Sequence, residues 1–231
     1  MREIVLDTET TGFEPSEGDR IVEIGAVELF NHLPTGRTYH QYINPKRNMP
    51  EAAFNVHGLS EEFLSDKPVF KDIVQEFTDF IKASKLVIHN ASFDVKFLNA
   101  ELGWVNRPAL PMHQAIDTLV IARRKFPGSP ASLDALCRRF GIDNSSRTLH
   151  GALLDSEILA EVYLELVGGR QPNLVLSGPE VKITKDGAPS ADWRPSPRPK
   201  PLASRLSETE KAAHETFIAA LESDALWLKE T

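Results

Sequence analysis

Two periodicities of apolar residues alternate along residues 1 to about 168. Short aliphatic and β-branched runs, separated by turn-forming stretches such as GFEPSEGD and NHLPTG, predict strands at IVLDTE, IVEIGAVELF, TYHQYINP and KLVIHN. Apolar residues at helical spacing predict helices at PVFKDIVQEFTDFIKAS, SFDVKFLNAELGW, DTLVIARRKF, SLDALCRRFG and GALLDSEILAEVYLELVGG. Three strands in a meander that continues into β–α units indicate an α/β fold, with one mixed sheet flanked by helices.

The chain changes character after Gly169. Residues 172–201 hold seven of the sixteen prolines and few apolar residues, so we expect a flexible linker there. Ser207 and Glu210 then form the pattern of a capping box, which predicts a last helix. That helix has no domain of its own to pack on, which favours docking on a partner.

Composition narrows the class of protein. Hydrophobic content of 41% and charged content of 26% are typical of a soluble globular protein. No apolar run is long enough for a membrane span, and Met1 leads directly into a strand instead of a signal peptide. The single cysteine, Cys137, excludes an internal disulfide, suits a reducing compartment and is expected to be buried filler, so we expect a cytoplasmic protein.

The net charge of -7 and the pI near 5.5 argue against a broad basic surface for duplex DNA. The chain therefore avoids nucleic acid, binds it locally, or relies on partners and metal ions to do so.

Two acids stand at the end of the first predicted strand. Asp7 and Glu9 share one face of that strand, about 6.6 Å apart, while Thr8 points to the other face. Two buried carboxylates repel each other, and divalent Mg²⁺ or Mn²⁺ relieves that cost. Taken alone, however, the pair is better explained as a solvated strand end.

Two further segments change this interpretation. Asp94 lies in the first turn of a predicted helix, where the helix dipole by itself explains an acid. Asp155 interrupts an apolar helix face, where a solvated acid is not expected. His150 precedes that helix, and taken alone it is better explained as a cap or a surface residue. Together the acids and the histidine supply what two-metal phosphoryl chemistry requires, namely ligands for two ions and a proton acceptor.

The segments LDTETTG, HNASFDVKFL and HGALLDSEI resemble, in order and spacing, the three motifs of the DEDDh class of 3′–5′ exonucleases, with NVHGLS between the first two. The resemblance covers residues 1 to about 170 and implies a ribonuclease-H-like mixed sheet. It also implies roles for individual residues. Two divalent ions, Mg²⁺ or Mn²⁺, would be held by Asp7, Glu9, Asp94 and Asp155. His150 would be the general base. The 3′-terminal nucleotide would contact Glu9, Thr10, Thr11, Phe54 and His57. Asp117 matches a recurrent acid of the class but is left out of the catalytic set, as an acid that supports the fold. Asn90 is expected to lie in a turn or behind the ligands and not to be a ligand itself.

The tail resembles that of the proofreading subunits of bacterial replicative DNA polymerases. QPNLVL is similar to sliding-clamp-binding peptides, which implies clamp contacts by Gln171, Leu174 and Leu176. The last helix would dock on the polymerase (alpha) subunit through Phe217, Leu221 and Trp227, and a small accessory subunit is a further candidate partner. The implied organisation is an exonuclease domain at 1–170, a clamp peptide at 171–176, a linker at 177–206 and a docking segment at 207–231.

We therefore expect a DNA exonuclease that proofreads for a replicative polymerase and releases nucleoside 5′-monophosphates. An enzyme that takes only a few unpaired 3′-terminal nucleotides needs no broad basic face. Two alternatives stay open, an exoribonuclease of the same class that trims RNA 3′ ends and a non-catalytic assembly subunit of the replisome. The motifs do not separate DNA from RNA, whereas the tail favours the replicative function.

Overall fold

The computed structural model describes residues 1–145, 147, 149–169 and 206–220. The chain divides into two units, Met1–Leu174 and Val175–Thr231. Each unit is described by itself.

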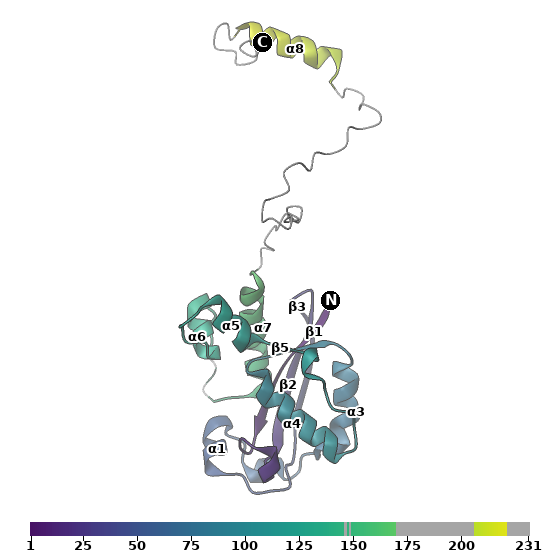
Figure 1. Cartoon of the computed structure of the whole chain (residues 1–231), viewed down its shortest axis with the longest axis vertical. Helices are drawn as coiled ribbons and strands as arrows, with labels where there is room; N and C mark the ends of the chain where they lie inside the picture. The colour runs from purple at the N-terminus through teal and green to yellow at the C-terminus, as the bar shows by residue number, and fades with distance from the viewer. Residues whose placement is uncertain (146, 148, 170–205, 221–231) are drawn as a thin grey trace, which may run out of the picture. The chain divides into compact units, whose positions relative to one another are not determined.

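One five-stranded sheet forms the centre of the first unit (Figure 1). Its strands stand in the order β3-β2-β1-β4-β5. The first three pair antiparallel as the predicted meander, whereas β4 pairs parallel with β1 and β5 parallel with β4. The strands are β1 (Arg2–Thr10), β2 (Ile21–Phe30), β3 (Leu33–Tyr42), β4 (Lys85–Ile88) and β5 (Ala115–Asp117).

Helices cover both faces of this sheet because its central strands are apolar on both sides. In β1, Ile4 and Leu6 pack with α3 (Phe70–Ile81) and α4 (Ala91–Trp104). Val5, between them, packs on the opposite face with α5 (Thr118–Lys125), α6 (Leu133–Phe140) and α7 (Ala152–Val167). Cys137 is buried in this second layer, as expected for a filler residue. The predicted mixed sheet flanked by helices is confirmed.

Short elements are where pattern and structure differ. Helices α1 (Glu51–His57) and α2 (Glu61–Leu64), strand β5 and two 3-10 turns, η1 (Pro15–Glu17) and η2 (Met112–Gln114), do not follow from the pattern because each has too few residues to show a period. The sequence predicts a turn over all of NHLPTG, which is longer than the turn in the structure. The turn is confined to Asn31 and His32, both with positive φ (52° and 67°), as in a two-residue hairpin, and β3 already begins at Leu33.

The second unit is described only for residues 206–220. It contains α8 (Glu208–Ala220), and the predicted capping box is present: the Glu210 amide donates to Ser207 Oγ at 3.3 Å, while the Ser207 amide donates to Glu210 Oε2 at 2.9 Å. Phe217 is exposed. The predicted contacts Gln171, Leu174, Leu176, Leu221 and Trp227, and the linker, lie outside the described residues.

No helix in the described ranges combines the length and the apolar character needed to cross a bilayer.

Candidate active site

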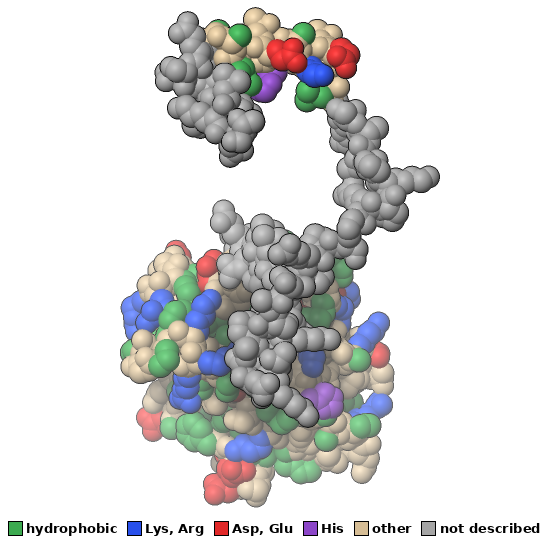
Figure 2. Space-filling model, turned by 45° about the horizontal axis from the view of Figure 1, so that its top comes forward, with side chains coloured by type: hydrophobic (Ala, Val, Ile, Leu, Met, Phe, Trp, Pro, Cys, Tyr) green, Lys and Arg blue, Asp and Glu red, His purple; other side chains and the backbone are tan. Residues whose placement is uncertain are grey.

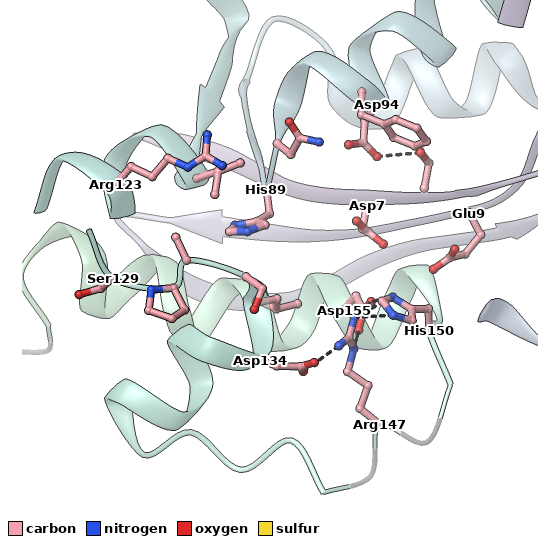
Figure 3. Close-up of a pocket in the computed structure, with 18 residues that line it drawn as sticks. Asp7, Glu9, His89, Asp94, Arg123, Ser129, Asp134, Arg147, His150 and Asp155 are labelled. Atoms are coloured by element: carbon pink, nitrogen blue, oxygen red, sulfur yellow. Dashed lines mark hydrogen bonds and ion pairs between the residues drawn. The ribbon is translucent and has the colours of Figure 1, made fainter. Parts of the chain in front are cut away.

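Four carboxylates and one imidazole meet at the end of β1, as Figure 3 shows. Asp7 and Glu9 come from β1, Asp94 from the first turn of α4, Asp155 from the first turn of α7, and His150 from the segment just before α7. All five line one cavity of about 640 Å³. The structure therefore brings together every residue that the sequence predicts for catalysis.

The acids reach this place from both layers of the fold. Asp7 and Glu9 point to the face that carries α7 and Asp155, in register with Val5. Thr8 points to the other face, as predicted, but it also belongs to the site, because its hydroxyl donates to Asp94 Oδ1 at 2.7 Å. This hydrogen bond orients an acid that comes from the α4 layer.

The start of α4 is held by Asp117 at the end of β5. Its carboxylate accepts the backbone amides of Asn90 and Ala91, both at 3.2 Å, and that of Leu119 at 2.9 Å. Asn90 adopts positive φ (68°) at the turn from β4 into α4. Asp117 and Asn90 thus position the helix that carries Asp94, in agreement with their assignment to support of the fold.

The start of α7 is held against β2 at Gly25, which pairs with Asp7 in the β1–β2 register. A Cβ at this position would stand 2.1 Å from the carbonyl carbon of Ala152, so only glycine allows the helix backbone to come this close. Ser156 Oγ donates to the Gly25 carbonyl at 3.0 Å in the same buried contact. Asp155 reaches β1 because of this close approach.

The electrostatics of the site disfavour four ionised acids. Burial, followed by the charges of Asp94, Glu9 and Asp155, raises the pKa of Asp7. Burial and then the nearby Glu23 raise the pKa of Glu9 to about 8. Burial also raises the pKa of Asp94 to about 7, although the Thr8 hydrogen bond opposes this shift. A divalent cation would stabilise the ionised forms of these groups.

Glu23, on the neighbouring strand β2, adds negative charge next to Glu9. It pairs with Glu9 across the β1–β2 ladder, next to a register irregularity between Glu9 and Thr10. It is buried, and its Oε1 lies 2.7 Å from Nε2 of His40 on β3. The motifs do not predict this effect of Glu23 on the pKa of Glu9, because the effect depends on the register of β1 and β2.

Arg147 is a further residue that the motifs do not indicate. Its guanidinium makes two parallel hydrogen bonds to Asp155, with Nη2–Oδ2 at 2.7 Å, and a third from Nη1 to Asp134 Oδ1 at 2.8 Å. Nη2 also lies 2.7 Å from His150 Nδ1. Burial raises the pKa of Asp155, but the contacts with His150 and Arg147 outweigh burial and hold it below its ordinary value.

The donor set fits a divalent ion. One ligand atom each from Glu9, His150 and Asp155 lies within 4.8 Å of the others, and the carboxylates are buried beside an open cavity. Two of these three atoms are carboxylate oxygens, the hard ligands that Mg²⁺ and Mn²⁺ prefer. The His150 side chain is about half exposed (48%), so substrate water can reach its ring.

A second cavity of about 450 Å³ adjoins the acids. Thr10 and Thr11 line it together with His57, the last residue of α1, and Phe93 of α4, which also lines the first cavity. Phe54, predicted to line the nucleotide pocket, is not among the lining residues. It is partly exposed, because the turns of α1 present Ala53 and His57 to the cavity instead.

His57 is 5% exposed, and burial lowers its pKa. Its Nδ1 accepts the Leu59 amide at 3.0 Å, so a neutral ring carries its proton on Nε2. The side chain is therefore a neutral donor at the wall of the second cavity, with Nε2 buried.

A family model described as Exonuclease (RNase_T) matches residues 4–163. The chain belongs to this exonuclease family. It is 60% identical over 174 residues to the DNA polymerase III subunit epsilon of Rickettsia felis, which covers 74% of this chain and 76% of that protein. It is 51% identical over 176 residues to the Escherichia coli K12 protein of the same name, which covers 73% and 72%.

Solved structures agree with this assignment. Exonuclease X in complex with 5′-overhanging duplex DNA matches with a TM-score of 0.57 at 26% identity, over 71% of this chain and 90% of that one. The nuclease domain of 3′hExo, a DEDDh family member bound to rAMP, matches with a TM-score of 0.63 at 21% identity, over 72% and 91%, and so shows the shared fold.

The predicted DEDDh resemblance and the assignment as a 3′–5′ exonuclease are confirmed. This exonuclease fold implies dependence on a divalent metal. The roles assigned to individual side chains stay predictions.

Proposed function

We propose that this exonuclease proofreads for a replicative DNA polymerase, removing mismatched 3′-terminal nucleotides as 5′-monophosphates. The observation that carries the proposal is the convergence of Asp7, Glu9, Asp94 and Asp155 with His150 in one cavity. The choice of DNA follows from relatives named as polymerase subunits at 51% and 60% identity.

The four acids would hold two divalent ions, Mg²⁺ or Mn²⁺. Bound there, such ions would supply the positive charge that stabilises the attacking and leaving oxygens of an in-line displacement. Thr8 keeps Asp94 in place, and Gly25 keeps Asp155 in place.

His150 would accept the proton of the attacking water. In the hydrolysis, the water oxygen forms a bond to phosphorus, the bond from phosphorus to the 3′ oxygen of the shortened strand breaks, and that oxygen gains a proton. The products are a nucleoside 5′-monophosphate and a new 3′ hydroxyl.

The second cavity would take the terminal nucleotide. Thr10, Thr11 and Glu9 lie along it, and His57 would donate from Nε2. The cavity accepts one end of a single strand, which costs least to separate when that end is mispaired.

The surface charge is consistent with this local mode of binding. On the face shown in Figure 2, Lys and Arg side chains stand in separate groups among apolar and acidic ones, and form no continuous basic surface over the described residues in view. A partner that holds the duplex fits this distribution better than binding of duplex DNA by this chain alone.

The tail would connect the exonuclease to its partners. Residues 171–176 would bind the sliding clamp, and residues 207–231 would dock on the polymerase subunit. The described part of α8 supports docking, because Phe217 is 59% exposed and all its neighbours except Ile218 are exposed.

A chain without residues 178–231 should retain hydrolysis of single strands but no longer co-purify with the polymerase subunit, and survival of that complex would refute the docking role.

A degradation assay on matched substrates tests the activity. The full chain should shorten a 3′-mismatched DNA primer in the presence of Mg²⁺ and not in EDTA, and should act more slowly on RNA of the same sequence. Asp155→Asn should abolish the reaction, whereas Asp79→Asn, which removes an exposed acid from α3, should leave it unchanged. Faster digestion of RNA would favour the exoribonuclease alternative, and full activity of the Asp155 variant would refute the metal assignment.

A further inference from the structure

Arg147 connects several groups of the site. Its side chain is 9% exposed, and it contacts Asp155, Asp134 and His150 at once. The negative charges of Asp7 and Glu9 are also partly balanced by it. This guanidinium is therefore a counter-ion to the acids of the cavity.

The same contacts conflict with a bound metal ion. Arg147 uses both carboxylate oxygens of Asp155, and it contacts His150 as well. Asp155 and His150 are two of the three residues whose ligand atoms cluster tightly enough to hold an ion. A guanidinium and a divalent cation would therefore compete for one carboxylate, and each would repel the other at this distance.

The contact with His150 also has a chemical consequence. A guanidinium has only donors, so Nδ1 of His150 must accept the hydrogen bond from Nη2. Nδ1 also approaches Asp155 Oδ2 at 3.3 Å, a contact that lowers the pKa of Asp155 only when Nδ1 carries a proton, and this tautomer competes with the contact to Arg147. A neutral ring that accepts at Nδ1 carries its proton on Nε2 and has no free nitrogen left for a proton from water.

We propose that Arg147 is an internal counter-ion that occupies Asp155 in the metal-free enzyme and leaves this carboxylate when a divalent ion binds. When Arg147 leaves, Nδ1 of His150 is free to accept a proton. Binding of the metal ion and activation of the general base therefore occur together. Asp134 at the start of α6 gives the guanidinium a second anchor at the cavity rim, since its carboxylate is 45% exposed and bound at 2.8 Å. This inference rests on the metal site proposed above.

Metal affinity of the full chain, measured by calorimetry with Mn²⁺ and without DNA, tests the competition. Arg147→Gln should bind Mn²⁺ about tenfold more tightly than the wild type, because the charged pair with Asp155 no longer has to be broken. Arg147→Lys keeps the charge but not the paired geometry, and should lie between the two. Arg123→Gln removes a cation that lines the same cavity, and should stay within about twofold of the wild type.

The proton position on the His150 imidazole provides a second measurement, which does not depend on enzyme activity. Nitrogen-15 NMR of the metal-free wild type should show Nδ1 of His150 as an acceptor and Nε2 as protonated, and the Nδ1 signal should change on addition of Mg²⁺. The metal-free Arg147→Lys variant, which serves if the glutamine variant fails to fold, should have lost part of this preference.

The outcomes separate the two proposals. If the wild type binds Mn²⁺ and both Arg147 variants bind it equally or more weakly, Arg147 supports the loaded site and the counter-ion role is wrong. If the wild type binds no divalent ion, the metal site of the proposed function is wrong as well.

Discussion

Gly25→Ala tests the idea that a single close backbone contact places Asp155. The added Cβ would stand 2.1 Å from the carbonyl carbon of Ala152 and 2.1 Å from the amide nitrogen of Leu153. Carbon atoms normally approach to about 3.5 Å, so the first turn of α7 would have to move away from β2 by about 1.4 Å. Asp155 lies in that turn and would move with it.

The size of this displacement sets the expected effects. Misplacement of a catalytic group by about 1 Å can reduce a rate about 100-fold, and we expect a loss of that order. Overpacking costs about 1–3 kcal/mol, and weakening of the Ser156 hydrogen bond to Gly25 adds about 1 kcal/mol. Together these lower the melting temperature by about 5–15 °C for a domain of this size.

Single-turnover digestion of a mismatched primer, Mn²⁺ calorimetry and thermal unfolding should be measured together. Gly103→Ala is the matched control, because Gly103 lies within α4 and an added Cβ there meets nothing within 4 Å. It should leave the rate unchanged and leave stability equal or raised by up to about 1 kcal/mol. A Gly25→Ala enzyme with wild-type rate and metal affinity would refute the positioning argument.

Three further predictions concern the acids. Thr8→Val removes the hydroxyl that donates to Asp94, so it should raise the pKa of Asp94 further and weaken Mg²⁺ binding about tenfold by calorimetry. Thr8→Ser keeps the hydroxyl and should bind Mg²⁺ like the wild type. Equal Mg²⁺ affinities of the valine variant and the wild type would exclude the orienting role. The metal-free protein should lose stability between about pH 5 and pH 8, because folded Glu9, with a pKa of about 8, keeps a proton that the unfolded chain releases near its ordinary value. Urea unfolding in EDTA at these two pH values measures this, and greater stability at pH 8 would contradict it. Glu101→Gln weakens the part-buried pair in which Arg20 donates to Glu101 at 2.7 Å and 2.8 Å. It should destabilise the fold by about 1–3 kcal/mol, because the Arg20 side chain is 29% exposed and can regain water. Because this pair lies outside the acid cluster, the loss should be the same with and without Mg²⁺, and a loss that Mg²⁺ abolishes would link it to the metal site.

The sequence by itself determined the sheet class, the long helices and the candidate acids. Long elements repeat their period several times, so α3 and α7 are visible in the apolar pattern. Asp155 stood out for the same reason, as an acid within an apolar helix face. Elements of three to seven residues, such as β5 and α1, carry too little of a period to be found in this way.

Only the tertiary structure decided how these residues meet. Strand register decides that Gly25 pairs with Asp7 and that Glu23 stands opposite Glu9, and register follows from how β1 and β2 pair and not from the residues of one strand alone. Arg147, which belongs to no helix or strand, contacts Asp155 eight positions further along the chain and lines the same cavity. The sequence therefore predicted the ligands of a metal site, whereas the contacts that orient those ligands and balance their charge depend on the tertiary structure.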